Sequence, residues 1–308
     1  MTEKRVVAVV QAGSDSFSCD STLVAFSQWL AKAKAQNVDL VVFPEAYLGG
    51  YPKGVDFGAR VGSRDSAGRE LFRLYSENAI ELGDERYQAI VKSVADHGVA
   101  TVLGVIERRG GTLYCSTFSF EGDGALLGVH RKLMPTAMER LIWGMGDGSD
   151  LPIMDSSAGR LVSAICWENY MPMLRSHYYA HNPDFYCVST VDDRPVWLPS
   201  MQMIALESRS FVLSASQFLK RGDISLDSEL FDATQGNDPE TVLINGGSCI
   251  ISPMGEVLAG PIWGKSDLLI AEVDLADRAR GQFDLDVAGH YSRPDVFELN
   301  VTGSQKQL

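Results

Sequence analysis

Short apolar runs alternate with longer amphipathic stretches along most of the chain. Residues 6–10 and 38–43 are apolar runs of strand length, and residues 21–35 between them place Phe26 and Leu30 close to one helical face. The same reading predicts further strands at residues 100–107, 112–120, 125–130, 161–165, 185–189, 211–216, 248–252 and 268–273, and further helices at residues 70–81, 84–97, 171–181 and 199–209.

Strands and helices alternate over the whole length, and no Pro/Ser-rich linker divides the chain. This pattern favours one α/β domain over residues 1–308 rather than two domains, with layered sheets covered by helices. Two segments interrupt the alternation. Residues 49–68 are predicted to form a long loop, and residues 222–241, which are rich in acids and turn-forming residues, are interpreted as a surface insertion.

Composition excludes several classes of protein. The chain is 45% hydrophobic and 22% charged, as in ordinary globular proteins, and no apolar stretch approaches the roughly 18 residues that span a membrane. Its start lacks a signal-peptide pattern, so a cytoplasmic location is expected. The net charge of -13 argues against nucleic acid and anionic membranes as partners. The five cysteines form no Cys-x-x-Cys pair, which argues against a disulfide framework and a zinc ribbon.

Glu45, Lys132 and Cys166 each follow an apolar run that is predicted to be a strand. Each residue has an ordinary interpretation when it is taken alone. A free cysteine is more often a small core residue, a carboxylate after a strand commonly caps the next helix, and a lysine can end a solvated basic cluster. Their shared position at strand ends, where α/β folds collect reactive groups, favours a nucleophilic catalytic site.

Other chemical motifs are weaker. His177 and His181 lie four residues apart on a predicted helix, but the glutamate of the metalloprotease pattern is missing, so no metal site is expected. The loop Gly144-Met145-Gly146-Asp147-Gly148 follows no strand and precedes no Lys-Ser/Thr pair. It is interpreted as a substrate-lining loop rather than a phosphate cradle. His130 and His290 are candidates for supporting roles around a catalytic site.

Together these motifs resemble the nitrilase superfamily of carbon-nitrogen hydrolases over nearly the whole chain. The resemblance is carried by Phe43-Pro44-Glu45, His130-Arg131-Lys132-Leu133 and Cys166-Trp167-Glu168-Asn169. It implies a four-layer α-β-β-α sandwich and a catalytic triad of Glu45, Lys132 and Cys166. It also implies that Glu139 positions the lysine and the substrate. Cys-Trp-Glu is typical of the nitrilase branch, whereas amidase and carbamoylase branches more often place Tyr and Asp after the nucleophile.

The resemblance implies hydrolysis of an organic nitrile to the carboxylic acid and ammonia. Glu45 would take the proton of Cys166, and the thiolate would add to the nitrile carbon to give a thioimidate and later a thioester. Lys132 and the backbone N–H of Trp167 would stabilise charge on the nitrogen. No metal or organic cofactor is required, and some amide by-product is expected. An amidase or carbamoylase that uses the same residues is the alternative, and a catalytically silent interaction protein is a second.

The partners of the chain follow from the same resemblance. A small-molecule nitrile is the expected substrate, and Tyr51, Trp143, Trp167, Val191 and Met201 are the candidate substrate contacts. The aromatic residues near the motifs favour a hydrophobic nitrile, but the choice among aliphatic, aromatic and arylacetonitriles stays open. The resemblance also implies a homodimer or a higher homo-oligomer.

Overall fold

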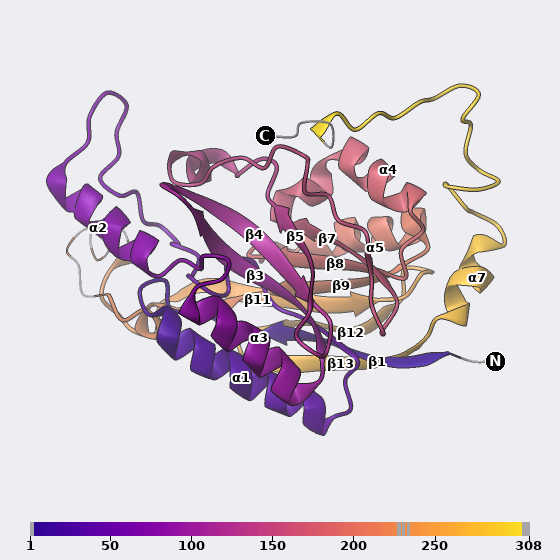
Figure 1. The fold of residues 1–308 in the computed structure, drawn as a ribbon, viewed down its shortest axis with the longest axis horizontal. Helices are drawn as coiled ribbons and strands as arrows, with labels where there is room; N and C mark the ends of the chain where they lie inside the picture. Colours follow the sequence, from indigo (N-terminus) through magenta and orange to yellow (C-terminus); the bar gives the residue numbers. More distant parts are fainter. Residues whose placement is uncertain (1–2, 227–228, 230–231, 233–234, 304–308) are drawn as a thin grey trace.

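Two β-sheets face each other in the computed structural model, and helices cover their outer faces (Figure 1). The structure describes residues 3–226, 229, 232 and 235–303. The first sheet has the strand order β13-β1-β2-β3-β4-β5. Its strands are β1 (Lys4–Gln11), β2 (Leu40–Val42), β3 (Ala100–Arg109), β4 (Thr112–Phe120), β5 (Leu126–Arg131) and β13 (Asp267–Asp274).

The second sheet has the order β10-β11-β9-β8-β7-β6, and β12 pairs with β11 outside this path. Its strands are β6 (Met154–Asp155), β7 (Arg160–Ile165), β8 (Phe185–Thr190), β9 (Phe211–Ser216), β10 (Phe218–Lys220), β11 (Val242–Ile251) and β12 (Val257–Trp263). The helices are α1 (Cys19–Ala35), α2 (Ser66–Glu77), α3 (Glu85–His97), α4 (Pro172–Ala180), α5 (Trp197–Ser208) and α7 (Ala276–Gln282), with 3-10 turns η1 (Ala137–Leu141), η2 (Cys166–Tyr170) and η3 (Arg221–Asp223).

Three clusters of buried apolar side chains fill the spaces between the layers. Phe26 of α1 and Val94 of α3 belong to the cluster on the outer face of the first sheet. Val42 of β2 and Leu213 of β9 belong to the cluster between the two sheets. Trp197 of α5 belongs to the cluster that joins α4 and α5 to the second sheet. Figure 1 shows the same order of layers, which confirms the predicted α-β-β-α sandwich.

Capping explains where two of the helices begin. The Asp65 carboxylate accepts a hydrogen bond from the Gly68 N–H at 2.6 Å, so α2 begins at Ser66, four residues before the predicted start at residue 70. The Asp84 carboxylate accepts from the Tyr87 N–H at 2.7 Å and starts α3 as predicted. The first of these helices was therefore correct in type but placed four residues too late.

Among the described strands and α-helices, the sequence analysis missed β6, β10, β12 and α7, and β11 begins at Val242 rather than at residue 248. Within the loop predicted at residues 49–68, residues 49–65 are irregular, and residues 66–68 belong to α2. Within the proposed surface insertion at residues 222–241, residues 227–228, 230–231 and 233–234 lie outside the described residues. Residues 236–240 are exposed, but Ile224 is buried. None of the described helices is long and apolar enough to cross a membrane. The single-domain organisation stays a prediction.

The strand directions bring the candidate catalytic residues to one end of the sandwich. Strands β1, β2 and β3 are parallel in the first sheet, and β7, β8 and β9 are parallel in the second. Glu45 follows β2, Lys132 follows β5 and Cys166 follows β7. Since parallel strands end at the same edge of a sheet, the turns after these strands can carry groups from both sheets into one place.

Candidate active site

Lys132 is completely buried between two carboxylates. Its Nζ atom lies 2.6 Å from Oε1 of Glu45 and 2.8 Å from Oε2 of Glu139. Glu139 belongs to η1 and is held by two further donors, because Oε2 accepts from the Thr136 N–H at 2.6 Å and Oε1 accepts from the Tyr51 hydroxyl at 2.8 Å. One ammonium group is therefore fixed between two acids that come from separate segments of the chain.

The two carboxylate oxygens of Glu45 have different surroundings. Oε1 accepts from Lys132 and from the Cys115 thiol, whose Sγ lies 3.6 Å away. Oε2 is buried and has no hydrogen-bond partner among the described residues. One oxygen is thus anchored, and the other is free to accept a proton. A buried acceptor without a partner is costly for stability, and such groups are common where a reaction uses them.

The backbone of the Glu45 segment is bound to the second sheet. The Ser189 hydroxyl donates to the Phe43 carbonyl, and the Gln217 amide donates to the Glu45 carbonyl, both at 2.8 Å. Ser189 lies at the end of β8, beside β7 and Cys166. These two bonds hold the acid of one sheet against the thiol-bearing edge of the other.

Cys166 occupies a sharp turn at the end of β7. It is buried and has a φ of 51°, a left-handed conformation that a non-glycine residue seldom adopts. The Asn169 side-chain amide donates to the Cys166 carbonyl at 2.8 Å and stabilises the turn. Strain of this kind is common at reactive residues, because it fixes a side chain where a relaxed backbone would not place it.

Charge and burial set the resting protonation states. Burial raises the pKa of Glu45, and Glu139 adds to the rise, while Lys132 opposes it. Burial alone would lower the pKa of Lys132, but the neighbouring carboxylates, Glu45 foremost, outweigh it and raise that pKa well above its ordinary value. Burial, and then the charge of Glu45, raise the pKa of the Cys166 thiol. In the resting site, Lys132 is therefore an ammonium group and Cys166 is a neutral thiol, which must give its proton to a base before it can react.

The structure brings three of the five candidate substrate contacts together with Cys166. Trp143 and Val191 belong to the same buried cluster as Cys166, and Tyr51 packs against it. The rings of Tyr51 and Trp143 meet edge to face at 5.7 Å between centroids. Trp143 also lies beneath Lys132, with Nζ 5.7 Å from the ring centroid. These aromatic rings form an apolar wall beside the charged groups.

Trp167 and Met201 lie in different surroundings. Trp167 is 43% exposed, and its indole N–H donates to Asp192 at 2.8 Å beneath the guanidinium of Arg194. Met201 is fully buried in the cluster between α5 and the second sheet, which does not contain Cys166. Its position on the inner face of α5 makes it part of the helix packing, and the structure does not bring it together with the reactive groups.

Cys115 was not singled out by the sequence analysis. Its thiol contacts Glu45, and its carbonyl accepts the backbone N–H of Lys132 at 2.8 Å, so it touches two of the three candidate triad residues. Cys115 lies inside β4, where nearly every side chain is buried, and therefore shows no distinctive pattern. Only the pairing of β4 with β5, which ends just before Lys132, reveals its position.

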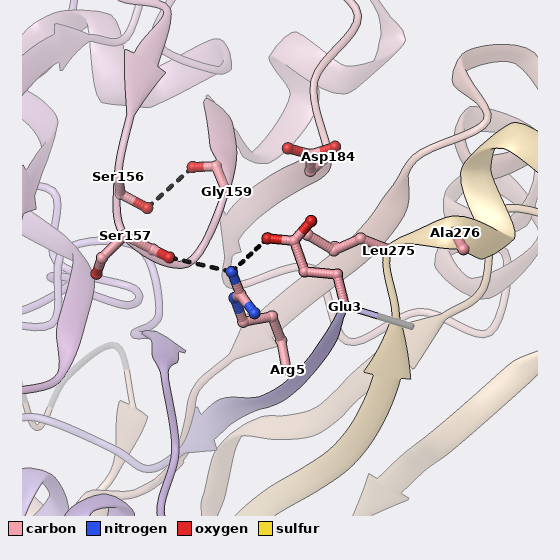
Figure 2. Close-up of a pocket in the computed structure, with 8 residues that line it drawn as sticks. All are labelled: Glu3, Arg5, Ser156, Ser157, Gly159, Asp184, Leu275 and Ala276. Atoms are coloured by element: carbon pink, nitrogen blue, oxygen red, sulfur yellow. Dashed lines mark hydrogen bonds and ion pairs between the residues drawn. The ribbon is translucent and has the colours of Figure 1, made fainter. Parts of the chain in front are cut away.

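A surface pocket of about 360 Å³ lies elsewhere, between the start of β1 and the turn before β7 (Figure 2). Its charged side chains already bind neighbouring groups. The Arg5 guanidinium donates to the Glu3 carboxylate at 2.7 Å and lies 3.5 Å from the Ser157 carbonyl. This pocket therefore shows a structural ion pair rather than a reactive arrangement.

Known proteins resemble the chain in sequence and in fold. The family model described as carbon-nitrogen hydrolase matches residues 6–281. A nitrilase of Bradyrhizobium diazoefficiens is 52% identical over 300 residues, which cover 97% of this chain and 92% of the relative. A bifunctional nitrilase/nitrile hydratase of Nicotiana tabacum is 46% identical over 294 residues, covering 95% and 84%. A solved structure from Saccharomyces cerevisiae, of branch 10 of the nitrilase superfamily, matches with a TM-score of 0.70 at 18% identity, covering 94% and 97%.

Proposed function

Because the chain belongs to the carbon-nitrogen hydrolase family, we propose that it is a nitrilase, which hydrolyses an organic nitrile to the carboxylic acid and ammonia. The observation that carries the proposal is the buried Lys132 ammonium between Glu45 and Glu139, with the Cys166 thiol close enough to Glu45 that each group shifts the pKa of the other. This arrangement supplies a nucleophile, a base and a positive charge in one apolar site.

The first half of the reaction forms a carbon-sulfur bond. The free oxygen of Glu45 takes the Cys166 proton as the sulfur adds to the nitrile carbon. The proton then passes to the nitrile nitrogen, which gives a thioimidate and restores the carboxylate. Lys132 and the backbone N–H of Trp167 stabilise the nitrogen while negative charge develops on it.

The second half consumes two water molecules. The first water, activated by Glu45, adds to the thioimidate to give a tetrahedral intermediate that carries hydroxyl, amino and thioether groups. Protonation of the amino group breaks the carbon-nitrogen bond, releases ammonia and leaves a thioester on Cys166. The second water breaks the thioester, releases the carboxylic acid and restores the thiol. Glu139 orients Lys132 and the amino group of the intermediate throughout.

Expulsion of the sulfur from the tetrahedral intermediate, in place of ammonia, releases an amide instead of an acid. The relative named as a bifunctional nitrilase/nitrile hydratase supports such partition in this group of proteins. Whether the acid or the amide is released depends on whether the nitrogen or the sulfur of the intermediate receives the proton. Tyr51, Trp143 and Val191 are the proposed substrate contacts, and their apolar surfaces favour a hydrophobic nitrile.

An amidase or carbamoylase that uses the same residues is the alternative. The relatives that share 52% and 46% of their residues with the chain are nitrilases, whereas solved amidases match at 16% identity, which supports a common fold alone. A silent interaction protein is disfavoured because the chain retains Glu45, Lys132 and Cys166 together. Homo-oligomerisation and the cytoplasmic location stay predictions.

Cys166→Ala tests the covalent mechanism. The variant should release no ammonia from a panel of aliphatic, aromatic and arylacetonitriles, while the wild-type protein hydrolyses at least one of them faster than the matching amide. Intact-protein mass spectrometry of the wild type should detect the acyl adduct. Cys187→Ala is the matched control, because Cys187 is a buried thiol between the sheets. Nitrile hydrolysis by Cys166→Ala would refute covalent catalysis through this residue.

A further inference from the structure

Glu168 joins the two turns that carry Lys132 and Cys166. Its side chain is fully buried, with Oε1 accepting from the Leu133 N–H at 2.6 Å and Oε2 accepting from the Ile165 N–H at 2.8 Å. Leu133 directly follows Lys132, and Ile165 directly precedes Cys166. A single carboxylate thus holds the backbone beside the ammonium group at a fixed distance from the backbone beside the nucleophile.

His130 completes this connection. Its Nε2 lies 2.8 Å from Oε2 of Glu168, and its Nδ1 lies 2.8 Å from the Asp150 carbonyl oxygen. A carbonyl oxygen can only accept, so Nδ1 carries a proton. A carboxylate that accepts two backbone N–H groups is favoured in its ionised form, so Nε2 must also donate. The geometry therefore requires an imidazolium ring bound to a carboxylate, both with no exposed side-chain surface.

The electrostatic surroundings agree with that assignment. Burial opposes charge on His130, but Glu168 outweighs burial and raises the His130 pKa. Burial likewise opposes charge on Glu168, but His130 and the two backbone donors lower its pKa. The Asp150 carboxylate is bound by Arg131, and the ring of Tyr178 from α4 meets the imidazole edge-on at 6.5 Å. Tyr178 and Tyr186 are held neutral by burial, so they bring no charge to the pair.

We propose that the His130–Glu168 ion pair positions Lys132 relative to Cys166 and thereby sets the rate of catalysis, an inference that rests in part on the proposed nitrilase function. Neither residue touches the reacting atoms, so both are positioning residues. Stability alone is a weak reason for such a pair, since the cost of removing two charges from water offsets most of their attraction. A shift of about 1 Å between reacting groups can lower a rate about 100-fold, which makes a fixed distance valuable.

Three variants separate positioning from folding. In His130→Leu the Glu168 carboxylate loses its charged partner, and in Glu168→Gln an amide nitrogen must face one of the two backbone donors. Both variants should lower kcat for nitrile hydrolysis about 100-fold, while KM changes less than about threefold. In His130→Gln the amide can still donate to Glu168, so kcat should fall less than about tenfold. All rates are expressed per active site, counted by labelling of Cys166 with iodoacetamide.

A merely structural role would lower the number of labelled sites and leave kcat per site unchanged. Values of kcat for His130→Leu and Glu168→Gln within about threefold of the wild type would therefore overturn the proposal. The labelling rate of Cys166 gives a test without a nitrile, because a misplaced sulfur should react at a different rate in His130→Leu than in the wild type. If the wild type hydrolyses no nitrile, the proposed function fails while this comparison still judges the positioning role.

The wild-type protein provides a test that needs no stable variant. With ¹⁵N-labelled histidine, NMR should show both ring nitrogens of His130 protonated at neutral pH. Its doubly protonated signals should persist when the pH is raised above the ordinary histidine pKa of about 6.5. A singly protonated His130 ring at neutral pH would overturn the proposal.

Discussion

At the scale of single residues, Glu45 has one anchored and one free carboxylate oxygen. Lys132 and Cys115 both bind Oε1, so the carboxylate cannot rotate to present Oε1 to Cys166 without losing two hydrogen bonds. The unpartnered Oε2 is left as the proton acceptor. Cys115 suits this task because burial, followed by the charge of Glu45, raises its pKa well above the ordinary thiol value, so it keeps the proton that it donates.

Cys115→Ala should reduce kcat/KM roughly tenfold, because a buried hydrogen bond to a charged group is lost. Cys115→Ser should retain most activity, since the hydroxyl group can donate to the same oxygen. Steady-state ammonia release measures both variants, and circular dichroism checks that both are folded. Equal activity in Cys115→Ala and Cys115→Ser would show that the thiol does not assist Glu45.

The pH dependence of activity follows from the raised pKa of Glu45. Below that pKa the carboxyl is protonated and cannot take the Cys166 proton, so kcat/KM should fall on the acidic side. Because the pKa is raised, the fall should occur above the ordinary glutamate value of about 4.3. Removing the Cys115 donor disfavours the ionised form of Glu45. Cys115→Ala should therefore move the acidic fall in kcat/KM to still higher pH. The assignment of Glu45 as the base would be contradicted if kcat/KM fell at the ordinary glutamate pKa and if Cys115→Ala left that fall at the same pH.

Glu45, Lys132 and Cys166, the proposed triad, could be singled out from sequence because each stands at the end of an apolar run and within a specific motif. Cys115 and the links made by Glu168 could not be predicted in the same way. Their roles depend on which strands become neighbours, and β4 looks like any other buried strand. Met201 shows the opposite case. It was named as a candidate substrate contact, and the inner face of α5 buries it against the second sheet, in a cluster that does not contain Cys166.

At the scale of elements, the regular hydrophobic strands were predicted well and the weakly patterned ones were missed. Strand β12 includes Pro261 and is only partly buried along its length, so it lacks the alternation that marks a strand. Strand β10 has three residues, and α7 has seven, with two arginines and no continuous apolar face. Such elements form because they pack against parts of the fold that are already in place. The local sequence pattern does not reveal these tertiary contacts.

Arg278 shows how tertiary partners hold α7. Its guanidinium binds the Asp184 carboxylate, the Asn182 side chain and the Arg209 carbonyl, and its side chain is 10% exposed. Arg278→Met should lower the free energy of unfolding by about 2 kcal/mol, because Asp184 loses the charge that offsets its partial burial. Urea unfolding measures the change.

Arg280→Met is the matched control for this prediction. Arg280 lies on the same helix and binds Asp277 and Asp274, but its side chain is 60% exposed. Exposed ion pairs contribute little to stability, so the urea midpoint should stay close to that of the wild type. Equal decreases in the free energy of unfolding in the two variants would mean that the burial of Arg278 does not hold α7 in place.

At the scale of the whole molecule, the alternation of strands and helices predicts sheets that are covered by helices, and the structure has this layered arrangement. The pattern does not give the order of strands within each sheet, because β13 comes late in the chain and pairs beside β1. That pairing brings the last described strand against the first, so the first sheet is complete only when the segment up to residue 274 has folded. The proposed active site draws its residues from both sheets and therefore exists only in the assembled sandwich.

The outer face of α4 and α5 predicts how copies of the chain associate. Met173 on α4 and Met203 and Leu206 on α5 are exposed apolar side chains on the layer that covers the second sheet. Large apolar side chains that are left exposed on one layer favour a contact between proteins. Sedimentation velocity should show a dimer or larger assembly for the wild type, and Met203→Glu should shift it toward the monomer because a charge would be buried without a partner. Val24→Glu, on the exposed side of α1, is the matched control and should keep the wild-type size. A monomeric wild type, or equal dissociation in both variants, would place the contact elsewhere.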